Sequence, residues 1–339
     1  MPTIFFTKHF CHVAATLILL LCSMGLNSCT KHKESTSSSS QSADKNRDLE
    51  QQDRIPNSNF DTINVALFPA EDALPMLYAN EWGLLDSLGI KANFFIYRSQ
   101  MDAEQAISQG KANVGMSDMF RIVWLQSQKK AVGWLFSTNR QLFFVPNKTL
   151  RLSKISQIGD HMIASSRFSM DDYYLSNILK GNTEKNKADG TLSSAPIHVQ
   201  VNSLPLRLSM LLSHQVDGAV FNAFQAREAN DKGYKALSIK DNIAEGFGGY
   251  ACNTSWAADH IKQLRRVLKA YDIAVDRLAS MDSLPQLSNA PKILTPNNRQ
   301  SYSVDRVKHA PVSEVLNWLR RQNAISSNYH PDTLIVDLP

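Results

Sequence analysis

The sequence has few cysteines, and their positions exclude an internal disulfide bond. Only four occur in 339 residues. Cys11 and Cys22 lie in an amino-terminal segment that we expect to be removed, and Cys29 has a separate expected role, so Cys252 remains alone. An exported chain could form disulfides, but the simplest interpretation of Cys252 is a small buried thiol.

The chain also lacks a strong surplus of charge. Lys and Arg number 36 against 31 Asp and Glu, and the formal net charge is +5. The basic residues are dispersed and form no stripe, whereas nucleic-acid-binding domains concentrate them on one face. We therefore expect no nucleic-acid partner.

Motifs for catalysis and metal binding are missing. The sequence contains no HExxH, GxSxG, Walker or CxxC pattern. Of its nine histidines, His9 and His12 lie in the segment that we expect to be removed, and the others form no close pair. Cys252 and His260 lie eight residues apart, which is only a weak signal for a thiol–base pair. We expect a protein that is not an enzyme, with no metal and no cofactor.

The chain has one apolar run, and this run is short. Val13–Leu26 is uncharged and follows Lys8, but a bilayer-spanning helix needs about 20 apolar residues. This pattern is typical of a secretory signal. The following "LNSC" resembles the bacterial lipoprotein box, which implies cleavage after Ser28 and lipidation of Cys29; the alternative is an ordinary secretory signal with a chance cysteine.

Residues 29–60 are polar and rich in serine. Such a segment cannot bury enough apolar surface to offset chain entropy, so we expect a disordered tether. Its acidic and basic residues balance, which argues against a polybasic arm. The amino-terminal part therefore predicts a folded domain held at the periplasmic side of the cell envelope by a lipid anchor.

Strand and helix patterns alternate from residue 61 onward, which predicts a mostly parallel sheet covered by helices. The expected strands are 63–68, 91–97, 113–117, 132–136, 142–145, 161–165, 197–201, 217–221 and 234–239. The expected helices are 70–85, 99–110, 118–128, 169–180, 203–215, 222–231, 259–281 and 310–325.

Several residues mark expected helix ends. Ser99 and Ser169 each precede an acidic residue by three positions, as in a capping box, and Gly110 suits a carboxyl cap. Pro75 fits the first turn of its helix or marks a kink.

Two stretches of the chain look alike. Each of "AISQGKANVGMSDMF" and "LLSHQVDGAVFNAFQA" has a helix end, a short turn, Asn or Asp, a small-residue strand and a polar residue that opens a helix. Asn113 aligns with Asp217, and Ser117 aligns with Asn222 within one residue. We expect corresponding units in two lobes; convergence of similar elements is the alternative.

The phrases "ANEWGLL", "SQGKANVGM" and "HQVDGAVFNAF" resemble motifs of ABC-transporter substrate-binding proteins, in the branch for nitrate, sulfonates, taurine and thiamine-type pyrimidines. The resemblance covers about residues 63–239 and departs at Asn113 and Asn222, where the family more often has Asp and a "P-E-P" phrase. It implies an α/β, two-lobed type II periplasmic-binding fold, each lobe a mixed, mostly parallel sheet flanked by helices, with a helical carboxyl-terminal part.

That fold implies a division of the chain. Residues 61–147 and 250–339 would form lobe 1, and residues 148–249 lobe 2. The crossings would lie near 145–149 and 244–252, where glycines could serve as a hinge or a plain turn.

Ligands in such sheets bind outside the carboxyl ends of the strands. These positions, with nearby aromatic rings, give the candidate ligand contacts Phe68, Asp72, Ser117, Asp118, Ser165, Ser166, Asn222 and Phe247. Several of these strand ends open a helix, whose free N–H groups favour anionic or electron-rich atoms. The alternative roles are helix capping for the polar residues and core packing for the phenylalanines.

The resemblance implies a lipid-anchored monomer that captures a small organic or anionic solute and delivers it to an ABC permease in the inner membrane. Two alternatives remain open: an enzyme on the same fold, as in pyrimidine-synthesis and menaquinone-pathway relatives, and a solute-sensing module.

Overall fold

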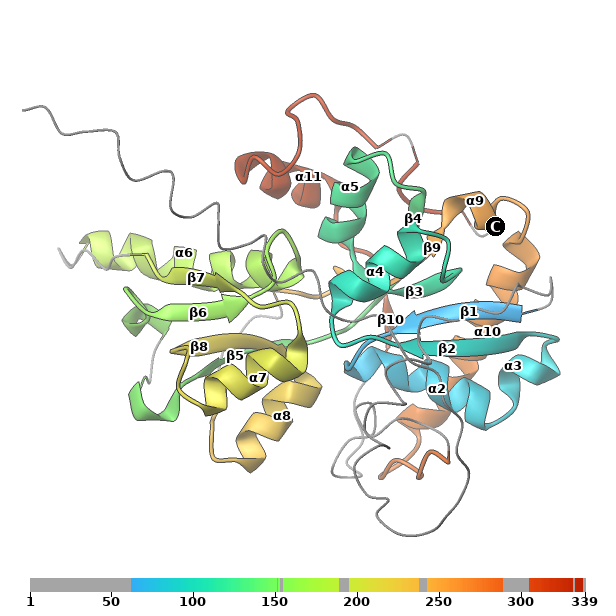
Figure 1. The fold of residues 1–339 in the computed structure, drawn as a ribbon, viewed down its shortest axis with the longest axis horizontal. Helices are drawn as coiled ribbons and strands as arrows, with labels where there is room; N and C mark the ends of the chain where they lie inside the picture. The colour runs from blue at the N-terminus through green and yellow to red at the C-terminus, as the bar shows by residue number, and fades with distance from the viewer. Residues whose placement is uncertain are drawn as a thin grey trace, which may run out of the picture. The chain divides into compact units, whose positions relative to one another are not determined.

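A computed structural model of the chain describes residues 62–150, 152, 155–188, 195–237, 243–288, 305–331 and 333–337 (Figure 1). The expected signal segment, the lipidation site Cys29 and the tether 29–60 lie outside these residues. Within the described part of the chain, no helix is long and apolar enough to cross a membrane.

The first sheet has six strands in the order β10-β4-β9-β3-β1-β2. They are β1 (Thr62–Leu67), β2 (Lys91–Ile96), β3 (Val114–Asp118), β4 (Val132–Thr138), β9 (Gly248–Asn253) and β10 (Arg306–Val307). Strand β1 pairs in parallel with β2 and β3, whereas β9 runs antiparallel to β3 and β4. Every residue of β3, β4 and β9 is buried, as expected for central strands covered on both faces.

Helices cover this sheet, and the sheet with its helices is called the first lobe below. They are η2 (Glu71–Ala73), α2 (Leu74–Glu81), α3 (Leu84–Ser87), α4 (Gln100–Ser108), α5 (Met119–Ser127), α9 (Thr254–Ala257), α10 (Ile261–Ala279) and α11 (Val312–Arg321). Helix α4 packs on β1 and β3, α10 packs on α2 and α3, and α11 packs on α5. Figure 1 shows α4 and α2 on opposite sides of β1.

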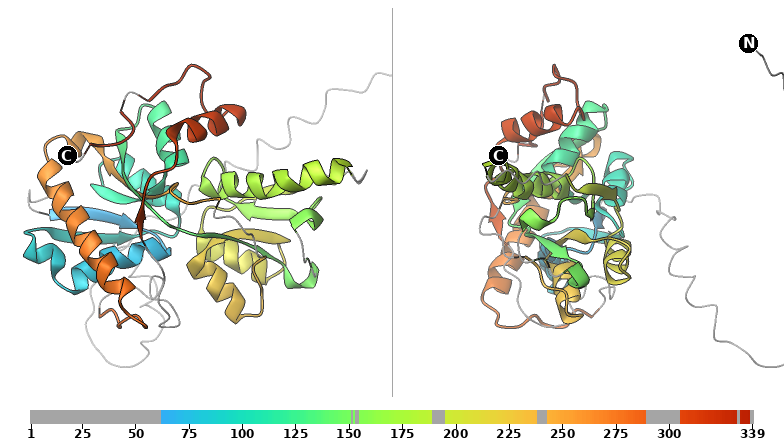
Figure 2. Two further views of the ribbon diagram at one scale, coloured as in Figure 1. Left: turned by 180° about the vertical axis from the view of Figure 1, so that it is seen from behind. Right: turned by 90° about the vertical axis from the view of Figure 1, so that its left-hand side faces the viewer.

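The second sheet has four strands in the order β5-β8-β6-β7. They are β5 (Leu142–Pro146), β6 (Met162–Ser165), β7 (Ile197–Gln200) and β8 (Gly218–Asn222), with the helices α6 (Met170–Ala188), α7 (Leu204–Leu212) and α8 (Ala223–Asp231) and the short turns η3 (Lys148–Leu150) and η4 (Ile155–Gln157). Strand β6 is parallel to β7 and β8, and β5 is antiparallel to β8. The sheet with its helices is called the second lobe (Figure 2). The expected α/β fold with two mixed sheets is confirmed. The second sheet is mostly parallel as expected, whereas three of the five strand pairings in the first sheet are antiparallel.

The internal likeness is confirmed element by element. Residues 99–129 and 203–233 align without a gap, so that α4, β3 and α5 correspond to α7, β8 and α8. Ser99 and Ser203 cap the first helix of each unit, and Gly110 and His214 both have a φ near +60 to +72°. The alignment places Asp118, rather than Ser117, opposite Asn222, and each caps the helix that follows its strand.

The hydrogen bonds at the beginnings of β3 and β8 correspond as well. The side-chain oxygen of Asn113 accepts from the Asn64 amide at 2.8 Å, and Asp217 accepts from the Met162 amide at 2.8 Å.

Two buried asparagines occupy equivalent positions beside these strands. Asn253 donates its side-chain amide to the Ile107 carbonyl at 2.9 Å, and Asn147 donates to the Leu211 carbonyl at 3.5 Å. Their backbone amides pair with the carbonyls of Asn113 and Asp217. Both side chains are therefore part of the internal framework of their lobe.

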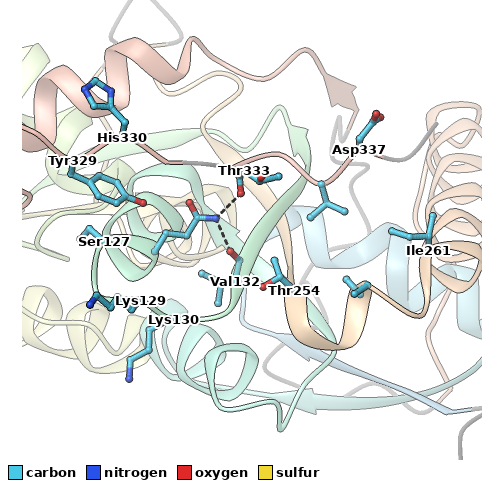
Figure 3. A pocket seen from close by; sticks show the side chains of 14 residues that line it. Ser127, Lys129, Lys130, Val132, Thr254, Ile261, Tyr329, His330, Thr333 and Asp337 are labelled. Atoms are coloured by element: carbon cyan, nitrogen blue, oxygen red, sulfur yellow. Dashed lines mark hydrogen bonds between the residues drawn. The ribbon is translucent and has the colours of Figure 1, made fainter.

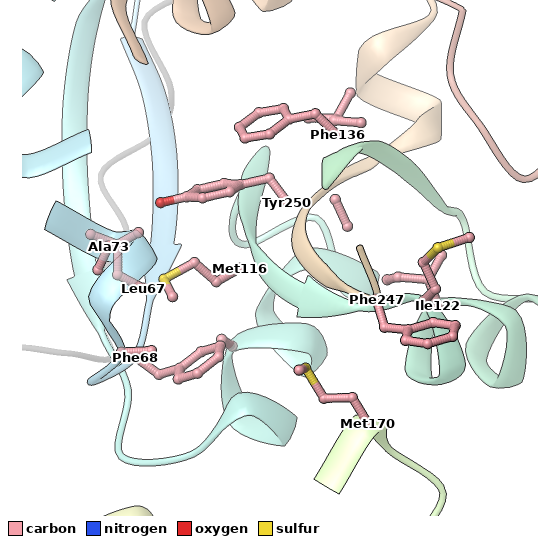
Figure 4. Close-up of a cluster of buried hydrophobic side chains, with 14 of the residues drawn as sticks. Leu67, Phe68, Ala73, Met116, Ile122, Phe136, Met170, Phe247 and Tyr250 are labelled. Carbon is pink, nitrogen blue, oxygen red and sulfur yellow. The ribbon is translucent and has the colours of Figure 1, made fainter. Parts of the chain in front are cut away.

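Aromatic side chains join three helices of the two lobes. The ring of Phe120 in α5 lies 4.7 Å from that of Tyr173 in α6 and 5.1 Å from that of Trp318 in α11, centroid to centroid. Trp318 also donates its indole N–H to Ser176 of α6 at 3.0 Å. The hydrophobic cluster of the first lobe thus extends into α6, and Figure 4 shows Met170 of α6 within it.

The structure corrects the sequence-based expectations at four elements. The helix expected over 70–85 is divided, because Gly83 adopts φ +64° between α2 and α3, and Pro75 lies in the first turn of α2. Strand β5, expected in lobe 1, pairs with β8, so the chain crosses between Thr138 and Leu142 rather than near 145–149. No strand forms over Tyr234–Leu237, and β9 was not expected at all.

Candidate functional site

All eight candidate ligand contacts are buried in this structure. The exposed fraction is 6% or less for Phe68, Asp72, Ser117, Asp118, Ser165, Ser166, Asn222 and Phe247. The residues therefore have protein partners, and these partners define the chemistry of the region where the two lobes meet. Their contact with a solute stays a prediction.

Asp72 follows β1 and forms a buried ion pair with Arg140. The carboxylate lies 2.7 Å from the Arg140 Nη2 atom and also accepts from the Thr138 hydroxyl at 2.9 Å. The side chains of Arg140 and Asp72 are 2% and 0% exposed. The guanidinium carbon lies 4.9 Å from the ring centroid of Phe68, so Phe68 covers this pair rather than an open surface.

A second buried ion pair lies at the end of β3. Glu104 of α4 pairs with the Arg121 Nε atom at 2.9 Å and accepts from the Ser117 hydroxyl at 2.7 Å. Gln100 donates to both Glu104 and Asp118, at 2.8 and 2.6 Å. Its amide oxygen accepts from Arg140 at 3.3 Å, which connects the two ion pairs in one network.

Two carboxylates of the first lobe bind helix N-termini of the second lobe. Asp118 accepts from the Met170 amide, at the first residue of α6, at 3.0 Å. Glu71 accepts from the Ala223 amide, at the first residue of α8, at 3.3 Å, and from the Gln141 amide at 2.8 Å. Helix N-termini carry free N–H groups and a positive dipole end, so carboxylates stabilise them. The protein's own acids thus occupy the positions at which an electron-rich ligand group was expected.

Burial perturbs the acidity of both bridging carboxylates. Burial, and then the charge of Asp72, raises the pKa of Glu71 to about 7. Burial, and then the charge of Glu104, raises the pKa of Asp118 to about 7. Both acids therefore change their protonation state near neutral pH, where a group in water would be fully ionised.

The segment after β1 also meets the start of α8 through amide groups. The Pro69 carbonyl accepts from the side-chain amides of Asn222 at 2.8 Å and Gln225 at 3.2 Å. The other end of the Gln225 side chain, its Oε1 atom, is buried and has no hydrogen-bond partner among the described residues. The amide cannot be reversed, because its oxygen would then face the Pro69 carbonyl oxygen.

The hydroxyls at the end of β6 have partners within the second lobe. Ser165 contacts the Nε2 atom of His198, and Ser166 accepts from Arg207 at 2.6 Å. Arg207 also pairs with Asp171 at 2.7 Å. Burial, with the nearby arginines, lowers the pKa of His198 to about 4, so its ring is neutral at physiological pH.

Phe247 packs against the aromatic cluster of the helices. Its ring centroid lies 4.9 Å from those of Phe120 and Tyr173. This contact gives Phe247 a core role in the described arrangement.

Sequence reasoning missed several members of this network: Glu71, Gln100, Glu104, Arg121, Arg140 and Gln225. One of them had a usable signal, because Glu104 lies on the apolar face of α4 with Ala103 and Ile107, where an acid needs a buried partner. Arg140 lies between two strands in a polar stretch, which resembles any exposed turn.

A pocket of about 620 Å³ lies elsewhere on the first lobe (Figure 3). Its lining includes Ser127, Lys130, Thr254 and His330. It opens at the carboxyl end of α5, whereas Asp118 caps the amino end of this nine-residue helix, about 13 Å away along the axis. It is therefore separate from the strand ends. No group of three His, Cys, Asp or Glu residues suited to a metal ion occurs within the described ranges.

Comparison with solved structures gives the same architecture. The alkanesulfonate-binding protein SsuA from Xanthomonas axonopodis pv. citri, bound to MOPS, matches with a TM-score of 0.59 and 14% identity, over 80% of this chain and 96% of that one. The periplasmic aliphatic sulphonate binding protein SsuA from Escherichia coli matches with a TM-score of 0.59 and 10% identity, over 82% and 95%.

The periplasmic nitrate-binding protein NrtA from Synechocystis PCC 6803 matches with a TM-score of 0.54 and 11% identity, over 64% of this chain and 62% of that one. No protein-family model matches the sequence, and no curated protein matches it. The chain therefore has the two-lobed fold of the periplasmic substrate-binding proteins of ABC transporters.

Proposed function

We propose that this protein is a lipid-anchored solute-binding protein that captures a small molecule between its two lobes and delivers it to an ABC permease. The observation that supports the proposal is that the two lobes contact each other at the carboxyl ends of their strands. Asp118 and Glu71 of the first lobe bind the amino ends of α6 and α8 in the second lobe. In a fold whose solved relatives bind solutes, this is the region where ligands are bound.

Solute entry requires these bridges to separate. The contacts between the lobes include Asp118 with Met170, Glu71 with Ala223 and the two amides on Pro69. Opening would expose Asp72, Asp118 and Asn222, together with the hydroxyls of the strand ends. A solute that replaces the lost hydrogen bonds would then hold the lobes together again.

The amino-terminal segment supports delivery at a membrane. A lipid on Cys29, followed by the polar tether 29–60, would hold the folded lobes beside a membrane on the periplasmic side. Replacing the thiol by Cys29→Ala should release the protein from the membrane fraction, because a single acyl-bearing residue provides the attachment. Unchanged membrane association of the variant would reject the lipid anchor.

The binding role is tested by thermal melting of the purified full chain in the presence of small solutes. The panel holds pyrimidines, sulfonates, nitrate, amino acids and organic amines. A ligand that binds only the native state adds about 2.7 kcal/mol of stability at a hundred times its dissociation constant. At least one class should raise the melting temperature, and a panel without any effect would refute the proposal.

The same experiment separates the alternatives. An enzyme on this fold would convert a stabilising compound, so the recovered compound is analysed for turnover. Unchanged compound supports binding, and conversion would support the enzyme. A sensing module would bind a solute equally well but would have no permease partner, which co-purification from membranes tests.

A further inference from the structure

We propose that the solute is a small organic cation that carries N–H donors, such as an ammonium or an amidinium, and that Glu71 and Gln225 are among the groups that bind it. This inference rests on the proposed function and narrows it to one class of solute. It follows from the balance of charge and of hydrogen-bond acceptors where the lobes meet.

Buried acids outnumber buried bases in this region. Four carboxylates belong to the network, namely those of Glu71, Asp72, Glu104 and Asp118, and all are 2% exposed or less. Arg140 is paired with Asp72, and Arg121 is paired with Glu104. Glu71 and Asp118 are left without an ion pair among the described residues. A bound cation would therefore balance the negative charge of this region, whereas a bound anion would be repelled.

The present hydrogen-bond donors to the two unpaired acids are neutral, and one donor to each acid belongs to the second lobe. Glu71 is held by backbone amides of Gln141 and Ala223, and Asp118 is held in part by that of Met170. When the lobes separate, Ala223 and Met170 move away with the second lobe. A solute with N–H donors can replace these amides, and its positive charge strengthens the hydrogen bonds to carboxylates.

An acceptor with no partner lies at the same junction and provides independent support. The Gln225 side chain is 5% exposed, and its Oε1 atom has no hydrogen-bond partner in the described part of the chain. The side chain is on the first turn of α8, two residues after Ala223, which donates to Glu71. A buried acceptor without a donor is costly, and a solute N–H would satisfy it.

The test compares probes of similar shape and different charge on the purified full chain. Calorimetric titration is carried out at pH 7.5 with two sets of probes. The aromatic set is benzamidine (a cation), benzamide (neutral) and benzenesulfonate (an anion). The second set compares the cations putrescine and agmatine with the anions propane-1-sulfonate and nitrate. A cationic probe should bind at least tenfold more tightly than its neutral and anionic counterparts. Tighter binding of an anionic probe would overturn the inference and leave the proposed function intact. If neither these probes nor any solute of the wider melting panel binds, both the inference and the proposed function are refuted.

Two variants connect the preference to named residues. Glu71→Gln removes the charge at constant size and should weaken the best cationic probe about tenfold or more, as expected for a hydrogen bond to a charged group. Gln225→Met removes the free acceptor and should weaken binding severalfold. The matched control is Glu228→Gln on the same helix, because Glu228 is exposed and pairs with Lys232. Equal affinity of wild type and Glu71→Gln for the cationic probe would overturn the assignment of Glu71 to the binding site. The comparison of probes on the wild-type protein tests the charge preference even if that variant fails to fold.

Discussion

The ion pair between Arg140 and Asp72 provides a sharp test of how the two lobes are stabilised. Arg140 makes its strong contacts inside the protein. Its Nη2 and Nε atoms donate to Asp72, at 2.7 and 3.0 Å, and its Nη1 atom donates to Gln100 at 3.3 Å. The substitution Arg140→Met keeps much of the side-chain stem and removes the guanidinium. Asp72 then remains buried, with the Thr138 hydroxyl as its side-chain donor.

The expected cost is large because one charge of a buried pair is left uncompensated. Removing one partner of such a pair lowers the free energy of unfolding by about 3 to 5 kcal/mol. At roughly 2 to 4 °C per kcal/mol for a domain of this size, the melting temperature should fall by about 6 to 20 °C. The double variant Arg140→Met/Asp72→Asn should be more stable than Arg140→Met alone, because it also removes the unpaired charge.

Urea unfolding followed by circular dichroism measures these differences. Lys232→Met is the control, since it breaks an exposed pair with Glu228 whose side chains are 47% and 41% exposed. That change should cost at most about 0.5 kcal/mol. If Arg140→Met costs less than about 1 kcal/mol, or if the double variant is no more stable than the single one, the argument from burial is wrong.

Three further predictions concern acidity, packing and backbone spacing. The pKa of Glu71 rises from 4.5, and that of Asp118 from 3.8, to about 7 in the folded state, so the folded protein binds more protons than the unfolded chain between those values. The stability that the two protonated acids contribute is complete below about pH 4 and is lost as the pH rises to 7. His198, whose pKa falls from 6.5 to about 4, has the opposite effect on stability. Because there are two acids and one histidine, the melting temperature should fall as the pH rises from 4 to 8. A melting temperature that rises steadily over this range would contradict the assignment. Trp318→Ala should cost about 3 to 5 kcal/mol in urea unfolding, because the side chain is 1% exposed among aromatic rings; a loss below about 1 kcal/mol would show that the cluster does not join the lobes. Gly249→Ala should cost about 3 kcal/mol, since the added Cβ would lie 2.1 Å from a carbonyl oxygen of β4, and an unchanged melting curve would show that β9 can shift freely.

Local sequence signals predicted the elements whose pattern is self-contained. Ser99 accepts from the backbone amide of Asp102, as the capping box indicates, and Ser169 caps α6. Gly110 adopts φ +72° after α4, as expected for a carboxyl cap. These features depend on residues a few positions apart, so one short stretch of sequence is sufficient to specify them.

Strand β9 could not be predicted in this way. Its sequence begins with two glycines and has no β-branched residue, so its intrinsic strand preference is low. It forms because β3 and β4 flank it and satisfy its backbone groups on both sides. Here tertiary pairing overrides local preference.

The position of the polar network at the strand ends was predictable, but the partners within it were not. The rule that ligands lie at strand ends directed attention to Asp72 and Asp118, and both are in the network. Their partners come from distant parts of the chain: Arg140 lies 68 residues after Asp72, and Met170 lies 52 residues after Asp118. No local pattern contains this pairing, because the fold alone brings these residues together.

The equivalent asparagines beside β3 and β8 have a consequence for how the protein can be produced. Asn147-Lys-Thr149 and Asn253-Thr-Ser255 both match the acceptor sequence for N-linked glycans. The two asparagines are only 3% and 6% exposed, and their amide nitrogens donate to internal carbonyls. A sugar added during secretion from a eukaryotic host would prevent these contacts and block folding of the lobe that carries it, so a bacterial host, or removal of the hydroxyl residue in each sequon, is required.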